Sequence, residues 1–317
     1  MAKYRPRLAQ RTDQTFLTDG GLETTLIFLR GIDLPFFASF PLLDDEHGQQ
    51  ELTTYYETYL RIARERGLGF ILDTPTWRAS ADWGPKLGYD LSALRDLNVR
   101  SVAYLAQLRN AWERPGQSII LNGAIGPRGD GYKAGRMSAD EAEKYHAFQV
   151  DAFAETEADM VTGVTMNNIE EAVGVARAAN AADIPCVISF TVETDGRLAS
   201  GASLREAIER TDDATRASPI YYMINCAHPS HFEDALAQGE AWTSRIGGIR
   251  ANASAKSHAE LDDSTEVDIG DPADLARRYY GLRRNYPSLR VMGGCCGTDH
   301  RHLQAICDAC LPLAAAE

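Results

Sequence analysis

Eight short apolar runs, spaced about 40 residues apart, are the feature that most limits how this chain can fold. Most of them end near glycine, proline, asparagine or aspartate, and each is followed by a stretch with helical periodicity. The runs are continuous rather than alternating, which is typical of parallel strands buried on both faces. They cover residues 15–21, 70–75, 118–123, 159–165, 185–191, 220–226, 245–252 and 289–296.

Helical patterns lie between these runs. Two stripes at helical spacing are formed by Leu52, Tyr55, Tyr56, Tyr59 and Ile62, and by Ala142, Tyr145, Gln149, Ala152 and Phe153. The residues Ser138-Ala-Asp-Glu141 before the second stripe form a capping box, which marks the start of a helix. Residues 168–171 and 203–206 predict two more helix starts.

Strands that alternate with helices eight times predict an α/β protein with a single (β/α)8 TIM barrel. The predicted domain spans residues 1–317, with residues 1–14 as a loose N-terminal arm. A doubly wound open sheet is the alternative, but no G-x-G-x-x-G follows the first predicted strand. In such a barrel the chemistry lies at the carboxyl ends of the strands, so the polar residues at those ends are the candidates for function.

Composition restricts the partners and the compartment. The net charge of −13 argues against nucleic acid or an anionic membrane as a partner. No apolar run approaches the roughly 18 residues of a membrane span, and the N-terminus lacks the apolar core of a signal peptide. We therefore expect a cytoplasmic protein with reduced cysteines that acts on small molecules. A homo-oligomer is compatible with the sequence, which contains no obvious oligomerisation arm.

Three of the six cysteines end predicted strands: Cys226 the sixth, and Cys295 and Cys296 the eighth. Three thiolates at one barrel mouth would suit Zn²⁺, with a fourth position left open as in catalytic zinc sites. Neighbouring strand residues point to opposite faces, so Cys295 and Cys296 can share one ion only if the backbone leaves strand geometry. The flanking glycines allow such a turn.

The other cysteines have simpler interpretations. Cys186 lies inside a strand, and Cys307 and Cys310 share helical spacing with apolar neighbours, so we expect all three to pack in the core. Two alternatives stay open: a redox disulfide between Cys295 and Cys296, and a structural zinc site that adds Cys307 and Cys310 to that pair.

Four segments resemble the zinc-dependent homocysteine S-methyltransferases, which include betaine- and S-methylmethionine-dependent enzymes. They are residues 19–24 (DGGLET), 122–127 (NGAIGP), 224–229 (INCAHP) and 293–298 (GGCCGT). The resemblance implies a (β/α)8 barrel that binds Zn²⁺ through Cys226, Cys295 and Cys296. It also implies methyl transfer from a small cationic donor (S-methylmethionine, S-adenosylmethionine or a betaine) to a zinc-bound thiolate, with homocysteine giving methionine.

The same resemblance implies roles in acceptor binding. Asp19 would hold the homocysteine amino group, and Gly20 and Gly21 would reach its carboxylate. The acidic residue that the family has at the end of the fourth strand is Val164 here. Its loss would weaken ammonium binding by about 1 to 3 kcal/mol. Either Glu193 replaces it, or the acceptor is another thiol or a selenol.

Other strand ends provide further candidates. Thr74 and Trp77 follow the second strand, and Trp77 could hold a cationic donor by cation–π attraction. Asn122 could bind substrate from the third strand, and Asn225 could orient the turn or the substrate beside the first cysteine. A barrel metallohydrolase is the second functional class, disfavoured because no histidine ends a predicted strand. A zinc or redox sensor is the third.

Overall fold

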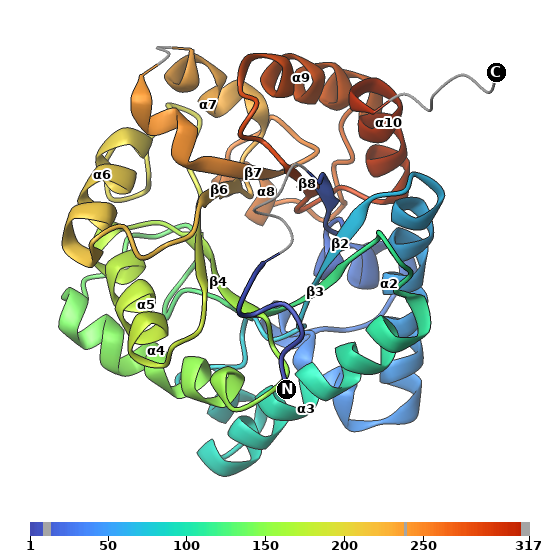
Figure 1. The fold of residues 1–317 in the computed structure, drawn as a ribbon, viewed down its shortest axis with the longest axis vertical. Helices are drawn as coiled ribbons and strands as arrows, with labels where there is room; N and C mark the ends of the chain where they lie inside the picture. Colours follow the sequence, from blue (N-terminus) through green and yellow to red (C-terminus); the bar gives the residue numbers. More distant parts are fainter. Residues whose placement is uncertain (9–13, 238–239, 312–317) are drawn as a thin grey trace.

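The computed structural model describes residues 1–8, 14–237 and 240–311, and within them eight parallel strands close into a barrel in chain order (Figure 1). The barrel closes because β1 pairs with both β2 and β8. Each strand overlaps one predicted run, so the (β/α)8 prediction is confirmed. The strands are β1 (Phe16–Leu17), β2 (Gly69–Asp73), β3 (Ile119–Ile125), β4 (Met160–Met166), β5 (Cys186–Phe190), β6 (Tyr222–Asn225), β7 (Ile246–Ala251) and β8 (Val291–Gly294).

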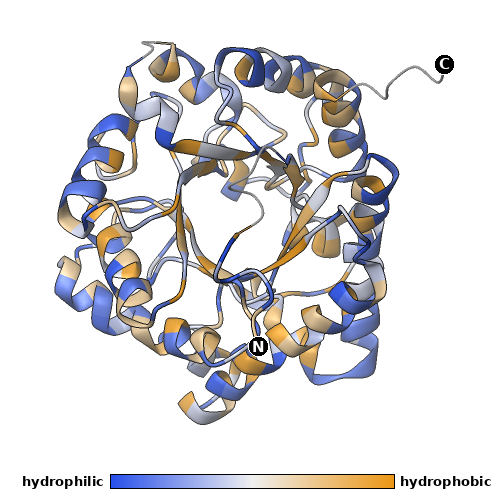
Figure 2. Ribbon diagram, viewed as in Figure 1, coloured by the Kyte–Doolittle hydropathy of each residue, from blue (hydrophilic) through white to orange (hydrophobic). Residues whose placement is uncertain are grey.

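Helices surround the barrel, with their hydrophobic sides turned toward the strands and their hydrophilic sides outward (Figure 2). The α-helices are α1 (Leu22–Thr24), α2 (Glu46–Glu65), α3 (Leu91–Trp112), α4 (Ala139–Ala154), α5 (Ile169–Ala181), α6 (Leu204–Thr215), α7 (Pro229–Leu236), α8 (His258–Asp262), α9 (Pro272–Asn285) and α10 (His300–Cys310). A π-helical segment covers Thr25–Leu29, and short 3-10 segments cover Pro35–Phe37, Phe40–Asp44, Gly84–Leu87 and Ala241–Arg245. None of the described helices is both long and apolar enough to cross a membrane.

The predicted helix starts agree with the structure. Ser138 and Glu141 form the capping box that opens α4. The side chain of Asn168 caps α5, and that of Ser203 caps α6. Each side-chain oxygen accepts a backbone N–H in the first helical turn, where no carbonyl of the helix is available.

Apolar side chains fill the lower half of the barrel, at the amino ends of the strands. The set comprises Phe16, Ile71, Ile120, Met160, Val187, Tyr221, Met223 and Val291, and Leu8 of the N-terminal segment joins it. The larger core lies between the strands and the helices, where Cys186 and Cys307 are buried as expected. With the lower half filled, chemistry is confined to the carboxyl ends of the strands.

The N-terminal segment lies at the amino end of the barrel. Of the expected loose arm 1–14, residues 9–13 lie outside the described residues, but residues 1–8 make contacts. The Tyr4 N–H donates to Asp159 at 2.7 Å, and the Arg5 guanidinium donates to the carbonyls of Ala154 and Ala158. Arg5 thereby satisfies a carbonyl at the end of α4 that has no partner inside the helix.

Candidate metal centre

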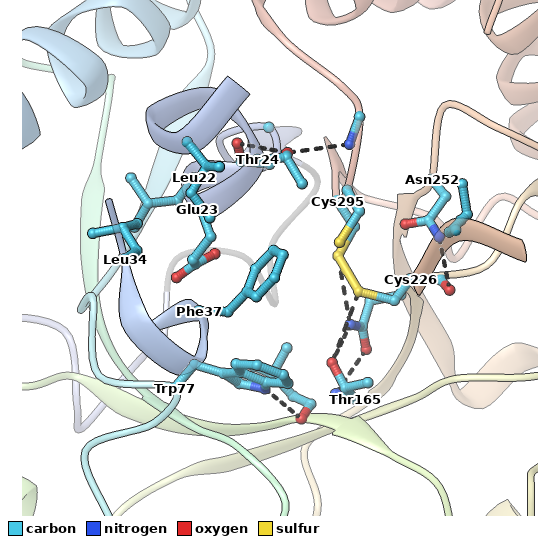
Figure 3. A pocket seen from close by; sticks show the side chains of 18 of the residues that line it. Leu22, Glu23, Thr24, Leu34, Phe37, Trp77, Thr165, Cys226, Asn252 and Cys295 are labelled. Atoms are coloured by element: carbon cyan, nitrogen blue, oxygen red, sulfur yellow. Dashed lines mark hydrogen bonds between the residues drawn. A yellow bond between two sulfur atoms is a disulfide. The ribbon is translucent and has the colours of Figure 1, made fainter. Parts of the chain in front are cut away.

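The side chains of Cys226, Cys295 and Cys296 meet at the carboxyl mouth of the barrel, with their sulfur atoms within 4.8 Å of one another. The structure joins Cys226 and Cys295 in a disulfide, with Cα atoms 5.3 Å apart, and leaves Cys296 as a free thiol (Figure 3). This corrects the expectation of three reduced cysteines. It also differs from the alternative disulfide, because the partner of Cys295 is Cys226 of another strand end rather than the adjacent Cys296.

The backbone leaves strand geometry where both neighbouring cysteines need to face the same space. β8 ends at Gly294, and the Thr298 N–H donates to the Cys295 carbonyl at 3.1 Å to form a turn. Gly297 in this turn has a φ of 76°, in the left-handed region that glycine adopts without steric cost. The predicted departure from the strand is therefore confirmed.

The donor set fits a zinc ion. Tetrahedral Zn–S bonds of about 2.3 Å would place the sulfur atoms about 3.8 Å apart, within the observed limit. Reduction of the disulfide by two electrons and two protons would provide three thiols, the soft ligands that zinc prefers. Burial raises the pKa of Cys296 to about 11, although a hydrogen bond with Tyr132 lowers it. A bound cation would favour the thiolate form of this group.

Asn225 and Thr165 hold the cysteines from neighbouring strand ends. The Asn225 amide oxygen accepts from the Thr165 N–H at 3.0 Å and from the Ser189 hydroxyl at 2.6 Å. The Asn225 amide nitrogen donates to the Thr165 hydroxyl at 2.8 Å and lies 3.9 Å from the Cys295 sulfur. The Thr165 hydroxyl in turn lies 3.9 Å from the Cys226 sulfur. Asn225 is thus engaged by the protein on all sides, which indicates a positioning role.

Thr165 was missed in the sequence, and its backbone is unusual. It has a φ of 64°, which is rare for a β-branched residue, and it lies where the register between β4 and β5 shifts. Such strain persists where the surrounding structure holds it, often at functional sites. Cys226 also has a positive φ, 52°. No sequence pattern marked either conformation.

A second layer of contacts holds the backbone of Cys226. The His258 imidazole bonds to the Cys226 carbonyl at 2.5 Å, and the Asn252 amide donates to it at 3.1 Å. The other nitrogen of His258 lies 2.9 Å from a carboxylate oxygen of Glu193. Glu193 does not line the cavity beside the thiols, so its contacts connect it to His258 rather than to an acceptor.

A cavity of about 580 Å³ opens beside the thiols. Most of the predicted site residues contribute to its walls, namely Asp19, Gly20, Gly21, Thr74, Trp77, Asn225 and the three cysteines. Val164, which replaces the family's acid, also lines it. Asn122 does not line it, because its amide donates to Asp73 at 2.7 Å within the barrel. The Thr74 hydroxyl accepts the Ala124 N–H at 2.9 Å and is thereby committed to the fold.

Trp77 lies at the cavity wall, but its ring already makes a cation–π contact with a side chain of the protein. The Arg78 guanidinium lies 4.0 Å from the centre of its ring, so a cation of the chain itself covers part of the indole. The Trp77 N–H lies 3.4 Å from the Val164 carbonyl. This contact places the edge of the ring beside the residue that replaces the family's acid.

Glu23 is a cavity residue that sequence reasoning missed. Its carboxylate points into the cavity beside Phe37 (Figure 3) and accepts a hydrogen bond from the Ser39 hydroxyl at 2.7 Å. Burial raises its pKa. The signal available in the sequence was an acid four residues after Asp19, at the carboxyl end of the first strand.

The fold and the thiol cluster define a barrel protein with a candidate soft-metal centre at its catalytic mouth. The family model described as homocysteine S-methyltransferase matches residues 16–310, so the chain belongs to this family and is a methyltransferase. The resemblance inferred from the four motifs is therefore confirmed.

Two kinds of relative agree with this membership. Homocysteine S-methyltransferase 2 of Arabidopsis thaliana is 22% identical, with 91% of this chain and 90% of the relative covered. The oxidised form of the homocysteine methyltransferase MmuM from Escherichia coli has a TM-score of 0.73 at 20% identity, covering 96% of this chain and 98% of MmuM. The metallated form of MmuM has a TM-score of 0.72 at 21% identity, with the same coverage. At this identity the structural likeness establishes the fold.

Proposed function

We propose that this protein is a zinc-dependent S-methyltransferase that moves a methyl group from a small cationic donor to a thiol, with homocysteine as the first acceptor to test. The convergence of Cys226, Cys295 and Cys296 beside a large cavity carries the proposal. Family membership supports methyl transfer to homocysteine. A metallohydrolase would need histidine and carboxylate ligands, which this cluster lacks.

The chain's own residues would position the reactants. When bound, zinc would supply an open position at which the acceptor thiol loses its proton at neutral pH. The acceptor sulfur would bond to the methyl carbon as the bond from that carbon to the donor breaks. The electron pair of the broken bond would neutralise the donor's positive charge. Asn225 and Thr165 would keep the cysteines in place during this exchange, and the cavity walls would limit access of water.

The charge of the cavity favours a cationic donor. Glu23 projects into it, and the mouth carries the carboxylates of Asp33, Asp130, Asp262, Glu266 and Asp268. These carboxylates outnumber the two arginines of the cavity wall, Arg78 and Arg250, and an excess of one sign of charge in a cleft raises the local concentration of ligands of the opposite sign. S-methylmethionine, S-adenosylmethionine and betaines all carry a cationic centre next to the methyl group.

A screen of thiol acceptors against these donors, read by mass spectrometry, tests the proposal. The protein is first reduced and loaded with zinc, and the matched control is the reduced protein without added metal. We expect a methylated thiol to form with at least one donor, and only in the zinc-loaded sample. Absence of methyl transfer across the whole screen would contradict the proposal.

Val164→Glu tests how the missing acid affects the acceptor. Val164 is partly exposed at the cavity wall, so a carboxylate there would face the bound acceptor. We expect one zinc ion per chain to be retained. We expect kcat/KM for homocysteine to rise between about 5- and 150-fold, as a new ammonium partner worth about 1 to 3 kcal/mol would produce. Val164→Gln is the uncharged control, and a fall in homocysteine activity in the glutamate variant would contradict this account.

Two further expectations from the sequence stay predictions. We expect the protein to act in the cytoplasm, where zinc-binding thiols are kept reduced. We also regard a homo-oligomer as compatible with the barrel. Fractionation of cells and sedimentation of the purified protein would test the two separately.

A further inference from the structure

Arg250 places a guanidinium inside the barrel, beneath the cavity. It lies in β7 and is paired in register with Asn225 of β6 and Gly293 of β8, the two strands that the metal-site cysteines follow. Its guanidinium forms ion pairs with Asp19 and Asp73, at the ends of β1 and β2. The side chain is 12% exposed and contributes to the cavity wall.

Both oxygens of each carboxylate already accept a hydrogen bond from a protein group. The Asp19 oxygen that does not face Arg250 accepts from the Tyr55 hydroxyl at 3.1 Å. The corresponding oxygen of Asp73 accepts from the Asn122 amide at 2.7 Å. An ammonium group that approached Asp19 would therefore compete with Arg250 and would lie beside a like charge, which is unfavourable in a buried site.

Arg250 itself retains hydrogen-bonding capacity. Arginine has five N–H donors, and the contacts to Asp19, Asp73 and the Gly294 carbonyl, at 3.2 Å from Nε, engage three of them. A guanidinium with donors left at a cavity wall suits the paired oxygens of a carboxylate.

We propose that the acceptor thiol is held through a carboxylate by Arg250, and that its amino group, where it has one, is not bound by Asp19. This inference rests on the proposed thiol methyltransferase function and specifies the part of the acceptor that the site recognises. Homocysteine satisfies it through its carboxylate. A mercapto-carboxylate without an amino group satisfies it equally well.

The charge balance of the trio formed by Arg250, Asp19 and Asp73 is compatible with an anionic ligand. Two buried carboxylates share one guanidinium, and burial raises the pKa of Asp19 to about 7, against the opposing effect of Arg250. Asp19 can therefore take up a proton near neutral pH when a carboxylate binds. The net charge of the three side chains, without the ligand, then changes from −1 to zero.

Two truncated acceptors test the inference on the unmodified, zinc-loaded protein. The compound 4-mercaptobutanoate is homocysteine without its amino group, and 3-mercaptopropylamine is homocysteine without its carboxylate. We expect kcat/KM for 4-mercaptobutanoate to lie within about tenfold of the homocysteine value. We expect 3-mercaptopropylamine to be lower by about 10- to 100-fold, the effect of losing hydrogen bonds to a charged group. Equal or better use of the amine would overturn the inference.

A binding measurement keeps this inference separate from the proposed function. The methyl thioethers of the two truncated acceptors need neither zinc nor turnover, so calorimetry can compare them directly. We expect 4-(methylsulfanyl)butanoate to bind at least about tenfold more tightly than 3-(methylsulfanyl)propylamine. If no thiol is methylated, the functional proposal fails. Binding of the thioethers still tests whether Arg250 binds a carboxylate. Tighter binding of the amine would reject that role.

The Arg250→Lys variant tests whether the guanidinium causes the preference for a carboxylate over an amine. Lysine keeps a cation between Asp19 and Asp73 but loses the forked donors. We expect the butanoate thioether to bind about tenfold more weakly, with binding of the amine unchanged. Arg245→Lys is the matched control, because Arg245 pairs with Asp212 at the opposite end of β7. The same loss in the Arg245 variant, or an unchanged preference in the Arg250 variant, would contradict the assignment.

Discussion

A Cys226→Ala variant should lose both its zinc and its methyl-transfer activity. Alanine leaves two thiols, Cys295 and Cys296, where three converge, and it also removes the partner of the disulfide. We expect zinc affinity to fall by more than about 100-fold, because changing groups that only support a metal ligand already costs 10- to 100-fold. Zinc per chain, measured on reduced protein after dialysis, and the initial rate of methyl transfer check this.

The control for this variant is Cys310→Ala. Cys310 lies at the end of α10 and packs against the core, outside the cavity wall. This variant should keep one zinc ion per chain and its methyl-transfer rate. A Cys226→Ala protein that retained its full zinc content would eliminate the three-ligand model.

An Asp159→Ala variant should be strongly destabilised without any change at the metal site. Asp159 is fully buried at the amino end of β4, where it pairs with Arg109 at 3.1 Å and accepts the N–H groups of Tyr4 and Leu121. Its removal leaves a buried guanidinium without that partner. We expect the free energy of unfolding to fall by about 3 to 5 kcal/mol. Urea unfolding measures the loss.

Asp140→Ala is the matched control for that variant. Asp140 also pairs with an arginine, Arg177, but its side chain is 81% exposed, so its loss should cost no more than about 1 kcal/mol. The folded fraction of the Asp159 variant should bind zinc as the unchanged protein does. Equal losses of stability in the two variants would contradict the structural role assigned to Asp159.

The strands and the three clustered cysteines could be predicted because their signals are local. A buried parallel strand reads as a continuous apolar run, and a cysteine directly after such a run must lie at the barrel mouth. Cys226 and Cys295 are 69 residues apart, yet their strand positions alone placed them together. The capping residues of α4, α5 and α6 could be predicted from equally local signals.

The charges that shape the acceptor site depend on contacts between distant segments. Arg250 pairs with Asp19 and Asp73 across 231 and 177 residues, and no spacing in the sequence identifies those partners. The available signal was a single arginine within an apolar strand, where a charge needs a buried partner. Thr165 could not be predicted for a different reason. Its position depends on a positive φ, which a β-branched residue rarely adopts, and on a register shift between β4 and β5.

X-ray absorption at the zinc edge of the reduced, zinc-loaded protein tests the three-thiolate centre most directly. Without an acceptor, the account predicts three sulfur ligands at about 2.3 Å and one lighter atom. Addition of homocysteine or 4-mercaptobutanoate should replace the lighter atom with a fourth sulfur. A zinc ion with fewer than three sulfur ligands, or a ligand set that no thiol acceptor changes, would contradict the account.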